Sequence, residues 1–150
     1  QDIGLKAASL ISDGSFVYID AGSTTLQMIP FIQAKHVVFI TNGLNIATEL
    51  IKFNHEVHIL GGQIKSMTAA VIGQEAIEAL ENYHFDLAFM GTNGISDLGY
   101  STPDIKEGLL KKKVIQRSRK SYVLSDQSKI GKTTSFVFAK AEDAELISNT

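Results

Sequence analysis

The 150-residue chain is 44% hydrophobic and carries a formal charge of −2, a composition that predicts one globular domain with a sizeable core. A charge this close to zero leaves no electrostatic footprint for direct binding of nucleic acid or of an anionic membrane. The absence of cysteine excludes disulfides and thiolate metal sites. Apolar stretches fall short of the roughly 20 residues of a membrane span, and no secretory signal opens the chain, so we expect a cytoplasmic location.

Short strand-like runs alternate with helical patterns, which predicts βαβ units and a mainly parallel sheet. Strands are expected at Phe16–Ile19, Val37–Ile40, Glu56–Leu60, Asp86–Met90, Tyr122–Ser125 and Ser135–Phe138, with a short last strand at Leu146–Ser148. Helices are expected over residues 3–12, 24–33, 44–53, 73–82 and 104–119. The predicted fold class is therefore α/β, a three-layer, mainly parallel, Rossmann-like sheet flanked by helices.

Helix boundaries are indicated by the two prolines and by the start of the chain. Pro30 lies inside the expected 24–33 helix, so that helix should start late, end early or kink there. Pro103 suits the first residue of the long helix, with Thr102 as its cap. The chain begins at Gln1 already in a helical pattern, so we expect an excised domain or a processed fragment whose missing neighbour holds part of the function.

The first strand ends in the segment YIDAGSTT, residues 18–25, which is the most informative part of the chain. A β-branched and aromatic run ends at Asp20, and Gly22 precedes three hydroxyl residues, Ser23, Thr24 and Thr25, that begin a helical stretch. This arrangement favours binding of an anion, because it combines unpaired N–H groups, the positive end of a helix dipole and a glycine that allows close approach. A phosphate would fit between Gly22 and Thr25; an ordinary turn with Ser23 or Thr24 as helix cap is the alternative.

Similar clusters of glycine and polar residues follow four more of the expected strands. They are Thr41-Asn42-Gly43, Gly61-Gly62, Gly91-Thr92-Asn93-Gly94 and the segment DQSKIG from Asp126 to Gly131. The carboxyl ends of parallel strands share one edge of a sheet, and ligands of open α/β sheets bind at that edge. We therefore expect the five clusters to converge on a polar ligand site.

Charged residues near these clusters fit such a site. Lys129 lies in a Ser/Gly loop where its ammonium can meet a phosphate, although a solvated loop lysine is the alternative. Asp20 and Asp126 end apolar strands, where a carboxylate can accept from sugar hydroxyls or hold the turn. Glu107 and Lys111 are four residues apart on one helix face, where an ordinary surface pair is the first expectation.

The remaining features predict no metal site, cofactor or catalytic residue. The histidines are scattered, and His55 and His58 point in no shared direction. The basic stretch from Lys111 to Lys120 spans most of a helical circumference, which favours a solvated or subunit-facing surface over a nucleic-acid patch. Neither Ser23 nor Ser125 has a histidine partner evident in the sequence. The dinucleotide motif GxGxxG and the phosphate loop GxxxxGK[ST] are both absent.

In order and spacing, these segments resemble the effector-sensing domain of DeoR-type bacterial repressors of sugar metabolism. The resemblance covers nearly the whole chain and includes AASLISDGSFVYIDAGSTT, VVFITNGLNIATEL, VHILGGQIKSMTAAVIG, DLAFMGTNGIS, GYSTPDIKEGLLKKKVI and VLSDQSKIGKT. It implies a fold related to ribose-5-phosphate isomerase and CoA transferases. It also implies binding of a phosphorylated sugar that alters operator binding by an N-terminal winged helix-turn-helix, which this chain lacks.

The same resemblance implies a set of effector-binding residues. They are Asp20, Gly22, Ser23, Thr24, Thr25, Thr41, Asn42, Gly61, Gly62, Gly91, Thr92, Asn93, Glu107, Lys111, Asp126 and Lys129. Three positions depart from the family pattern: Gln127 replaces a usual His, Ile130 a usual Phe, and Gly108 a usual Ala, which weakens that helix by up to about 1 kcal/mol. These departures affect the prediction of which sugar is bound more than the resemblance to the family.

A sugar-phosphate isomerase on the same fold is the alternative, with an acyl-CoA transferase-like or purely structural domain behind it. Isomerisation needs a base and a partner that stabilises the enediolate. The segment GTNGISDLGYSTPD lacks the paired acids and the lysine that ribose-5-phosphate isomerases carry there, and only Glu107 remains as a base. We therefore expect a sensor rather than an enzyme. A repressor that reads a two-fold operator needs at least a dimer, so a homo-oligomer is expected, with operator DNA contacted only through the missing domain.

Overall fold

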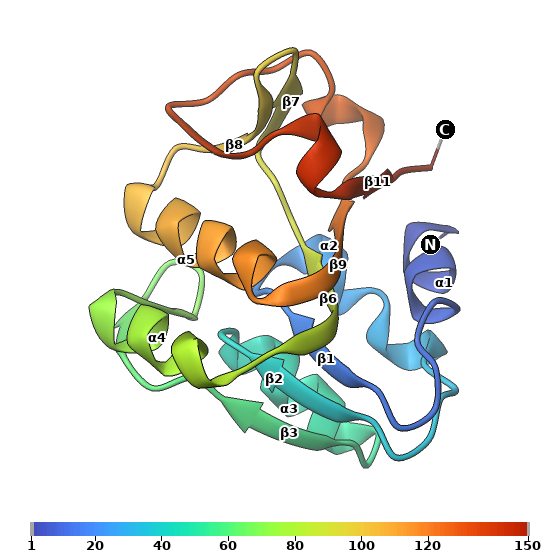
Figure 1. Cartoon of the computed structure of the whole chain (residues 1–150). Helices are drawn as coiled ribbons and strands as arrows, with labels where there is room; N and C mark the ends of the chain where they lie inside the picture. Colours follow the sequence, from blue (N-terminus) through green and yellow to red (C-terminus); the bar gives the residue numbers. More distant parts are fainter. Residues whose placement is uncertain (1, 150) are drawn as a thin grey trace.

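A computed structural model, which describes residues 2–149, has six parallel strands in its central sheet (Figure 1). From edge to edge the strands are β11 (Glu145–Ile147), β9 (Ser118–Leu124), β6 (Phe85–Met90), β1 (Phe16–Ile19), β2 (Val38–Thr41) and β3 (Glu56–Ile59). The chain moves outward from β1 to β3, returns to place β6 on the other side of β1, and then continues outward. The strand order therefore reverses between β1 and β6, and such a switch point opens a crevice at the carboxyl edge of a parallel sheet.

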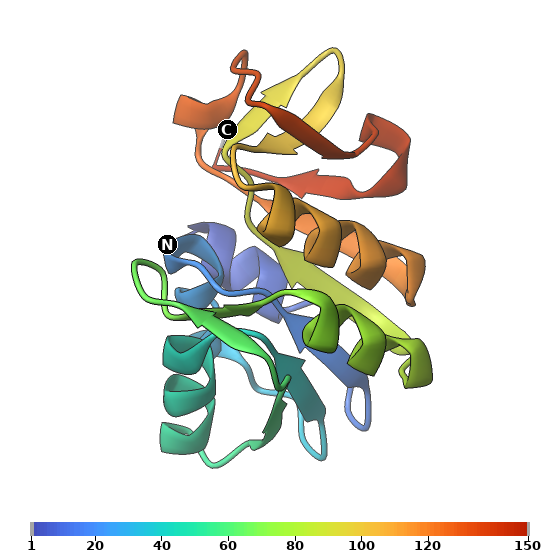
Figure 2. The same cartoon turned by 90° about the vertical axis from the view of Figure 1, so that its left-hand side faces the viewer.

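Helices cover both faces of the sheet, as Figure 2 shows. On one face lie α1 (Asp2–Ala8), α2 (Ser23–Leu26), the 3-10 turn η1 (Ile29–Phe31) and α3 (Leu44–Lys52). On the other lie α4 (Gln74–Ala79), the 3-10 turn η2 (Leu80–Asn82) and α5 (Ile105–Gln116). Among residues 2–149, no helix is long and apolar enough to cross a membrane.

The hydrophobic core has two halves because successive strand residues point to opposite faces. In β1, Val17 and Ile19 pack with α1 and α3, whereas Tyr18 packs with α4 and α5. Both halves contain fully buried apolar side chains, including Phe39 on the first side and Phe85 on the second. Burial on both faces produces the three layers that the sequence predicted, and the predicted parallel α/β fold is confirmed.

Two small antiparallel sheets lie outside the parallel sheet and were not predicted. One is the hairpin of β4 (Gln63–Lys65) and β5 (Ala70–Ile72). The other has the order β10-β8-β7 and consists of β10 (Phe136–Ala139), β8 (Gly99–Thr102) and β7 (Gly94–Ser96). The 3-10 turns η3 (Gln127–Lys129) and η4 (Ala141–Asp143) flank β10 in the chain. The expected strand at Ser135–Phe138 thus exists, but it pairs with β8 rather than with the main sheet.

The first of the two proline predictions is confirmed and the second is corrected. The 24–33 helix ends early: α2 stops at Leu26, and Pro30 lies in the separate turn η1. The long helix begins later than predicted, because Asp104 is its cap and accepts a hydrogen bond from the Glu107 N–H at 3.1 Å. Thr102, the predicted cap, belongs to β8.

The predicted end of the long helix at residue 119 is also wrong. The helix ends at Gln116, and residues 118–124 form β9, which pairs with β6 along most of its length. The basic stretch is therefore divided between a helix and a strand. Pairing with a buried neighbouring strand overrides the weak local helical preference of these residues.

Gly108 on α5 is required by close packing against β10. A Cβ atom at this position would lie only 2.2 Å from Cδ2 of Phe136. Alanine would favour the helix by up to about 1 kcal/mol, but overpacking typically costs about 1–3 kcal/mol. We therefore expect Gly108→Ala to lower the free energy of unfolding by about 1 kcal/mol, measured by urea denaturation. In a Phe136→Leu background the loss should become smaller, and a Gly108→Ala variant more stable than the parent would contradict this packing account.

Candidate functional site

A polar cavity of about 220 Å³ opens at the switch point between β1 and β6. Its lining comes from the loops after β1, β2, β6 and β9, from the β4–β5 hairpin and from α5. The lining residues are Asp20, Ala21, Gly22, Ser23, Thr24, Thr25, Asn42, Thr68, Ala70, Gly91, Thr92, Asn93, Glu107, Lys111 and Lys129. The predicted site residues thus largely gather around one space, at the edge of the sheet where the sequence placed them.

Four of the predicted site residues do not line this cavity. They are Thr41, Gly61, Gly62 and Asp126. The buried Thr41 hydroxyl donates to the Ile19 carbonyl at 2.5 Å and accepts from the Gly43 N–H at 3.0 Å. The Asp126 carboxylate caps η3 by accepting from the Ser128 N–H at 2.9 Å. These contacts give the two side chains a structural role, and their contact with a ligand stays a prediction.

Three lining residues were missed in the sequence: Ala21, Thr68 and Ala70. The last two belong to the β4–β5 hairpin and its turn, which the sequence pattern did not reveal. Thr68 and Ala70 do lie within the segment VHILGGQIKSMTAAVIG, so the resemblance marked the region without identifying the residues. Asn42 joins this hairpin to the sheet, because its amide donates to the Val71 carbonyl at 3.1 Å and its oxygen accepts from the Ala21 N–H at 2.8 Å.

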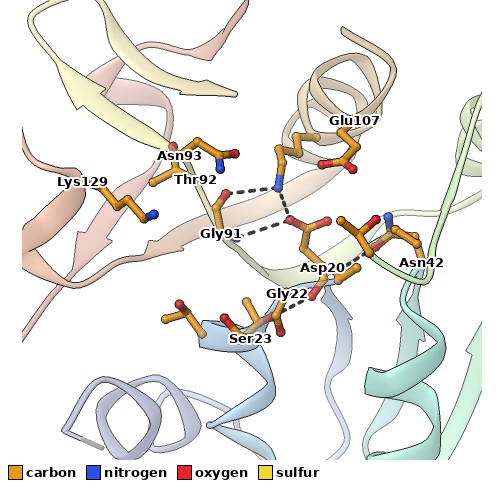
Figure 3. A pocket seen from close by; sticks show the side chains of 15 residues that line it. Asp20, Gly22, Ser23, Asn42, Gly91, Thr92, Asn93, Glu107 and Lys129 are labelled. Carbon is orange, nitrogen blue, oxygen red and sulfur yellow. Dashed lines mark hydrogen bonds and ion pairs between the residues drawn. The ribbon is translucent and has the colours of Figure 1, made fainter. Parts of the chain in front are cut away.

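A buried ion pair between Lys111 and Asp20 lines the cavity, and Figure 3 labels Asp20 near its centre. The Lys111 ammonium also donates to the Gly91 carbonyl at 3.2 Å, and the Gly91 N–H donates to Asp20 Oδ2 at 3.3 Å. Side chains of Lys111 and Asp20 are only 8% and 5% exposed. The expected surface pair of Glu107 with Lys111 is therefore wrong: Lys111 turns inward from α5 to β1.

The electrostatics of Asp20 follow from this burial. Removal from water raises the pKa of Asp20 above its usual 3.8, and the Lys111 ammonium and the Gly91 N–H partly offset that rise. An ionised carboxylate is tolerated at such depth only when it is paired and hydrogen-bonded. The pair thus places a fixed dipole at the wall of the cavity and adds little net charge there.

Glu107 lines the cavity and is held from behind by Lys65 of the β4–β5 hairpin. The Lys65 ammonium bridges Glu107 Oε2 at 3.1 Å and Asp104 Oδ2 at 2.7 Å. The hydrogen bond from Lys65 holds the pKa of Asp104 below its usual 3.8. This bridge ties the hairpin to the first turn of α5, so the hairpin wall of the cavity and the helix wall are joined.

The opposite end of the cavity consists of the loop after β1 and the side chain of Lys129. Gly22 has φ of +154°, a conformation that L side chains rarely adopt, and a Cβ there would meet only Thr25 Oγ1 at 3.6 Å. The N–H groups of Ser23 and Thr24 open α2 and have no partner within that helix. Because α2 is a single turn, its dipole is much weaker than the predicted 24–33 helix would provide. In Figure 3, Lys129 enters the cavity from the side opposite Glu107 and Asn42.

A three-layer α/β domain with a polar cavity at the switch point is a small-ligand-binding domain by architecture. The chain belongs to the DeoR family of sensor domains, because the family model described as the DeoR C terminal sensor domain matches residues 1–149.

Curated relatives agree with this assignment, and solved structures agree with the fold. The chain is 43% identical to an uncharacterized HTH-type transcriptional regulator FruR and 35% identical to the HTH-type transcriptional repressor GlcR, both from Bacillus subtilis (strain 168). Each alignment covers 97% of this chain but only 59% and 57% of the relatives, so the chain spans less than two thirds of their length. A ribose 5-phosphate isomerase A from Neisseria gonorrhoeae superposes with a TM-score of 0.63 at 16% identity, over 89% of this chain and 52% of that one. That likeness shows the fold alone.

Loss of either partner of the buried ion pair should destabilise the domain strongly. Lys111→Met leaves the Asp20 carboxylate buried without its cation, and we expect the free energy of unfolding to fall by about 3–5 kcal/mol. Asp20→Asn should cost a similar amount, whereas the double variant should lose clearly less than the sum of the two. Urea denaturation of the four proteins gives this coupling. Additive losses, or single variants as stable as the parent, would contradict a coupled buried pair.

Lys65 should control the titration of Asp104. A carboxyl group whose pKa is depressed on folding stabilises the protein above its ordinary pKa, and this stability is lost as the pH falls through the folded value. In Lys65→Met the pKa of Asp104 should rise toward 3.8, measured by NMR titration. The stability difference between parent and variant should therefore shrink between about pH 6 and about pH 3. Lys106→Met is the matched control, since that ammonium donates to the neutral Gln63 amide; an equal change there would reject the assignment.

Proposed function

We propose that the chain is the effector-binding part of a bacterial transcriptional repressor and that its cavity binds a phosphorylated sugar. The observation that supports this most directly is the end of the cavity formed by Gly22, Ser23 and Lys129. Ser23 and Thr24, whose N–H groups have no helical partner, line the same end of the cavity as the Lys129 ammonium. Within the described residues Lys129 takes part in no ion pair, so its charge is available to an anion.

The size and polarity of the cavity fit a small polar ligand. Its volume of about 220 Å³ lies below the ~300–1,000 Å³ of pockets for drug-sized ligands. The side chains around it are carboxylates, hydroxyls, amides and ammoniums, which suit the hydroxyl groups of a monosaccharide. A hexose phosphate of about 16 heavy atoms, at roughly −0.3 kcal/mol per atom, would bind with a sub-millimolar dissociation constant.

Regulation of DNA binding belongs to the same proposal. The relatives are HTH-type transcriptional regulators and are longer than this chain, so operator DNA would be contacted through a helix-turn-helix outside the 150 residues. Ligand binding would then shift the repressor between states of different operator affinity. The homo-oligomer stays a prediction that follows from the two-fold symmetry of such operators.

Catalysis is not part of the proposal, although isomerases share the fold. The candidate base Glu107 already accepts a hydrogen bond from Lys65, and Asp20 is committed to Lys111. A proton shuttle needs a carboxylate that is free to take up and release a proton near the reacting carbons. We therefore propose binding without turnover.

The role of Lys129 can be tested by titration calorimetry with glucose 6-phosphate, fructose 6-phosphate, fructose 1-phosphate and ribose 5-phosphate. Lys129→Ala removes a charge-assisted hydrogen bond worth about 1.5–3 kcal/mol, so affinity for the binding sugar phosphate should fall roughly tenfold to a hundredfold. Lys132→Ala removes the same charge from an exposed residue three positions later that does not line the cavity, and it should change affinity little. Both variants should unfold at the parental urea concentration.

Two results would reject the proposed function. One is the failure of every sugar phosphate in the panel to bind. The other is equal affinity for a sugar phosphate and for the same sugar without phosphate, because the cavity end described above recognises the anion.

A further inference from the structure

We infer that the cavity selects sugar monophosphates and rejects bisphosphates, and that Glu107 is the residue chiefly responsible for this selection. The inference rests on the proposed function and concerns the end of the cavity remote from Lys129. Figure 3 shows Glu107 and Asn42 on the side of the cavity opposite Lys129. A sugar whose phosphate lies against Lys129 and the Gly22 loop must therefore extend its other end toward Glu107.

The charges at this remote end are unfavourable for a second phosphate. At this end the carboxylates of Glu107 and Asp104 face the single ammonium of Lys65. The neighbouring pair of Asp20 with Lys111 adds no net positive charge. Both ammoniums are already committed, since each contacts one or two of these carboxylates. A phosphate dianion there would meet excess negative charge without a free cation, in a partly buried setting where water screens little.

The two carboxylates that line this part of the cavity, Glu107 and Asp20, need hydrogen-bond donors from a ligand. Glu107 accepts from Lys65 through Oε2, and Asp20 accepts from Lys111 and the Gly91 N–H through Oδ2. Among the described residues no donor reaches Glu107 Oε1 or Asp20 Oδ1, and both residues line the cavity. Sugar hydroxyl groups donate hydrogen bonds, whereas a phosphate dianion has no proton to donate. The two open carboxylate oxygens thus match a polyhydroxyl end of the ligand.

Lys65 holds the Glu107 carboxylate in place. Its ammonium holds the Glu107 carboxylate from outside the cavity and does not line the cavity itself. The Glu107 side chain is only 19% exposed and its Oε2 accepts from Lys65, so the carboxylate is fixed at the wall of the cavity. An anion that enters must therefore face this carboxylate.

The test compares each monophosphate that binds with its bisphosphate, by titration calorimetry on the 150-residue chain. The pairs are fructose 1-phosphate or fructose 6-phosphate with fructose 1,6-bisphosphate, and glucose 6-phosphate with glucose 1,6-bisphosphate. We expect the bisphosphate to bind at least about tenfold more weakly. In Glu107→Gln the ratio of the two affinities should fall by at least about fivefold, because the amide carries no charge and can donate to a phosphate oxygen. Glu75→Gln, an equal change at an exposed position of α4 outside the cavity, should leave the ratio unaltered.

The outcomes separate this inference from the proposed function. Binding of a monophosphate together with equal or tighter binding of its bisphosphate overturns the inference and leaves the proposed function standing. A preference for the monophosphate that Glu107→Gln does not reduce also overturns it, since the selection would then lie elsewhere. If no sugar phosphate binds, the proposed function fails and the inference fails with it.

Discussion

The buried ion pair between Asp20 and Lys111 is the interaction on which the site depends. Asp20 follows β1, Lys111 lies on α5, and the backbone of Gly91 after β6 contacts both side chains. Three segments that are far apart in the sequence thus meet at one pair of charges. Because separating these charges in a water-poor environment is costly, the two central strands and α5 are held in one arrangement. Asp20, Lys111 and Gly91 all line the cavity, so the arrangement fixes part of its wall.

The walls of the cavity follow from a second set of contacts, which attach small elements to this centre. Lys65 ties the β4–β5 hairpin to α5, and Asn42 ties the same hairpin to the loop after β1. On the other side, η3 supplies Lys129. The hairpin, α5 and the loop after β1 are therefore joined by polar contacts near the cavity, so a ligand that alters these contacts acts on several elements together. Such shared contacts are what a sensor needs, since coupling requires contacts that differ between two states.

Sequence reasoning succeeded where local physics decides the outcome. The strand Phe16–Ile19 was predicted with its true limits because β-branched and aromatic residues end at an aspartate and a glycine. Pro30 was correctly expected to interrupt its helix. Sequence reasoning failed where residues far apart in the chain determine the secondary structure. The long helix was extended to residue 119, because its basic residues do not reveal that Ser118 and Lys120 pair with β6. The β4–β5 hairpin was missed because its strands have three residues each and no alternating pattern long enough to detect.

The amino-acid sequence by itself determined the parallel α/β fold, the edge of the sheet where the polar loops gather, and most of the residues that line the cavity. These follow from hydrophobic periodicity and from the rule that parallel strands share a carboxyl edge. Only the tertiary structure decided which charges pair. Glu107 and Lys111 are neighbours on one helix face, yet Lys111 binds Asp20 and Glu107 binds Lys65. The physical reason is burial: packing turns Lys111 toward a desolvated carboxylate, and a charge in that position requires the nearest buried partner rather than its neighbour along the helix.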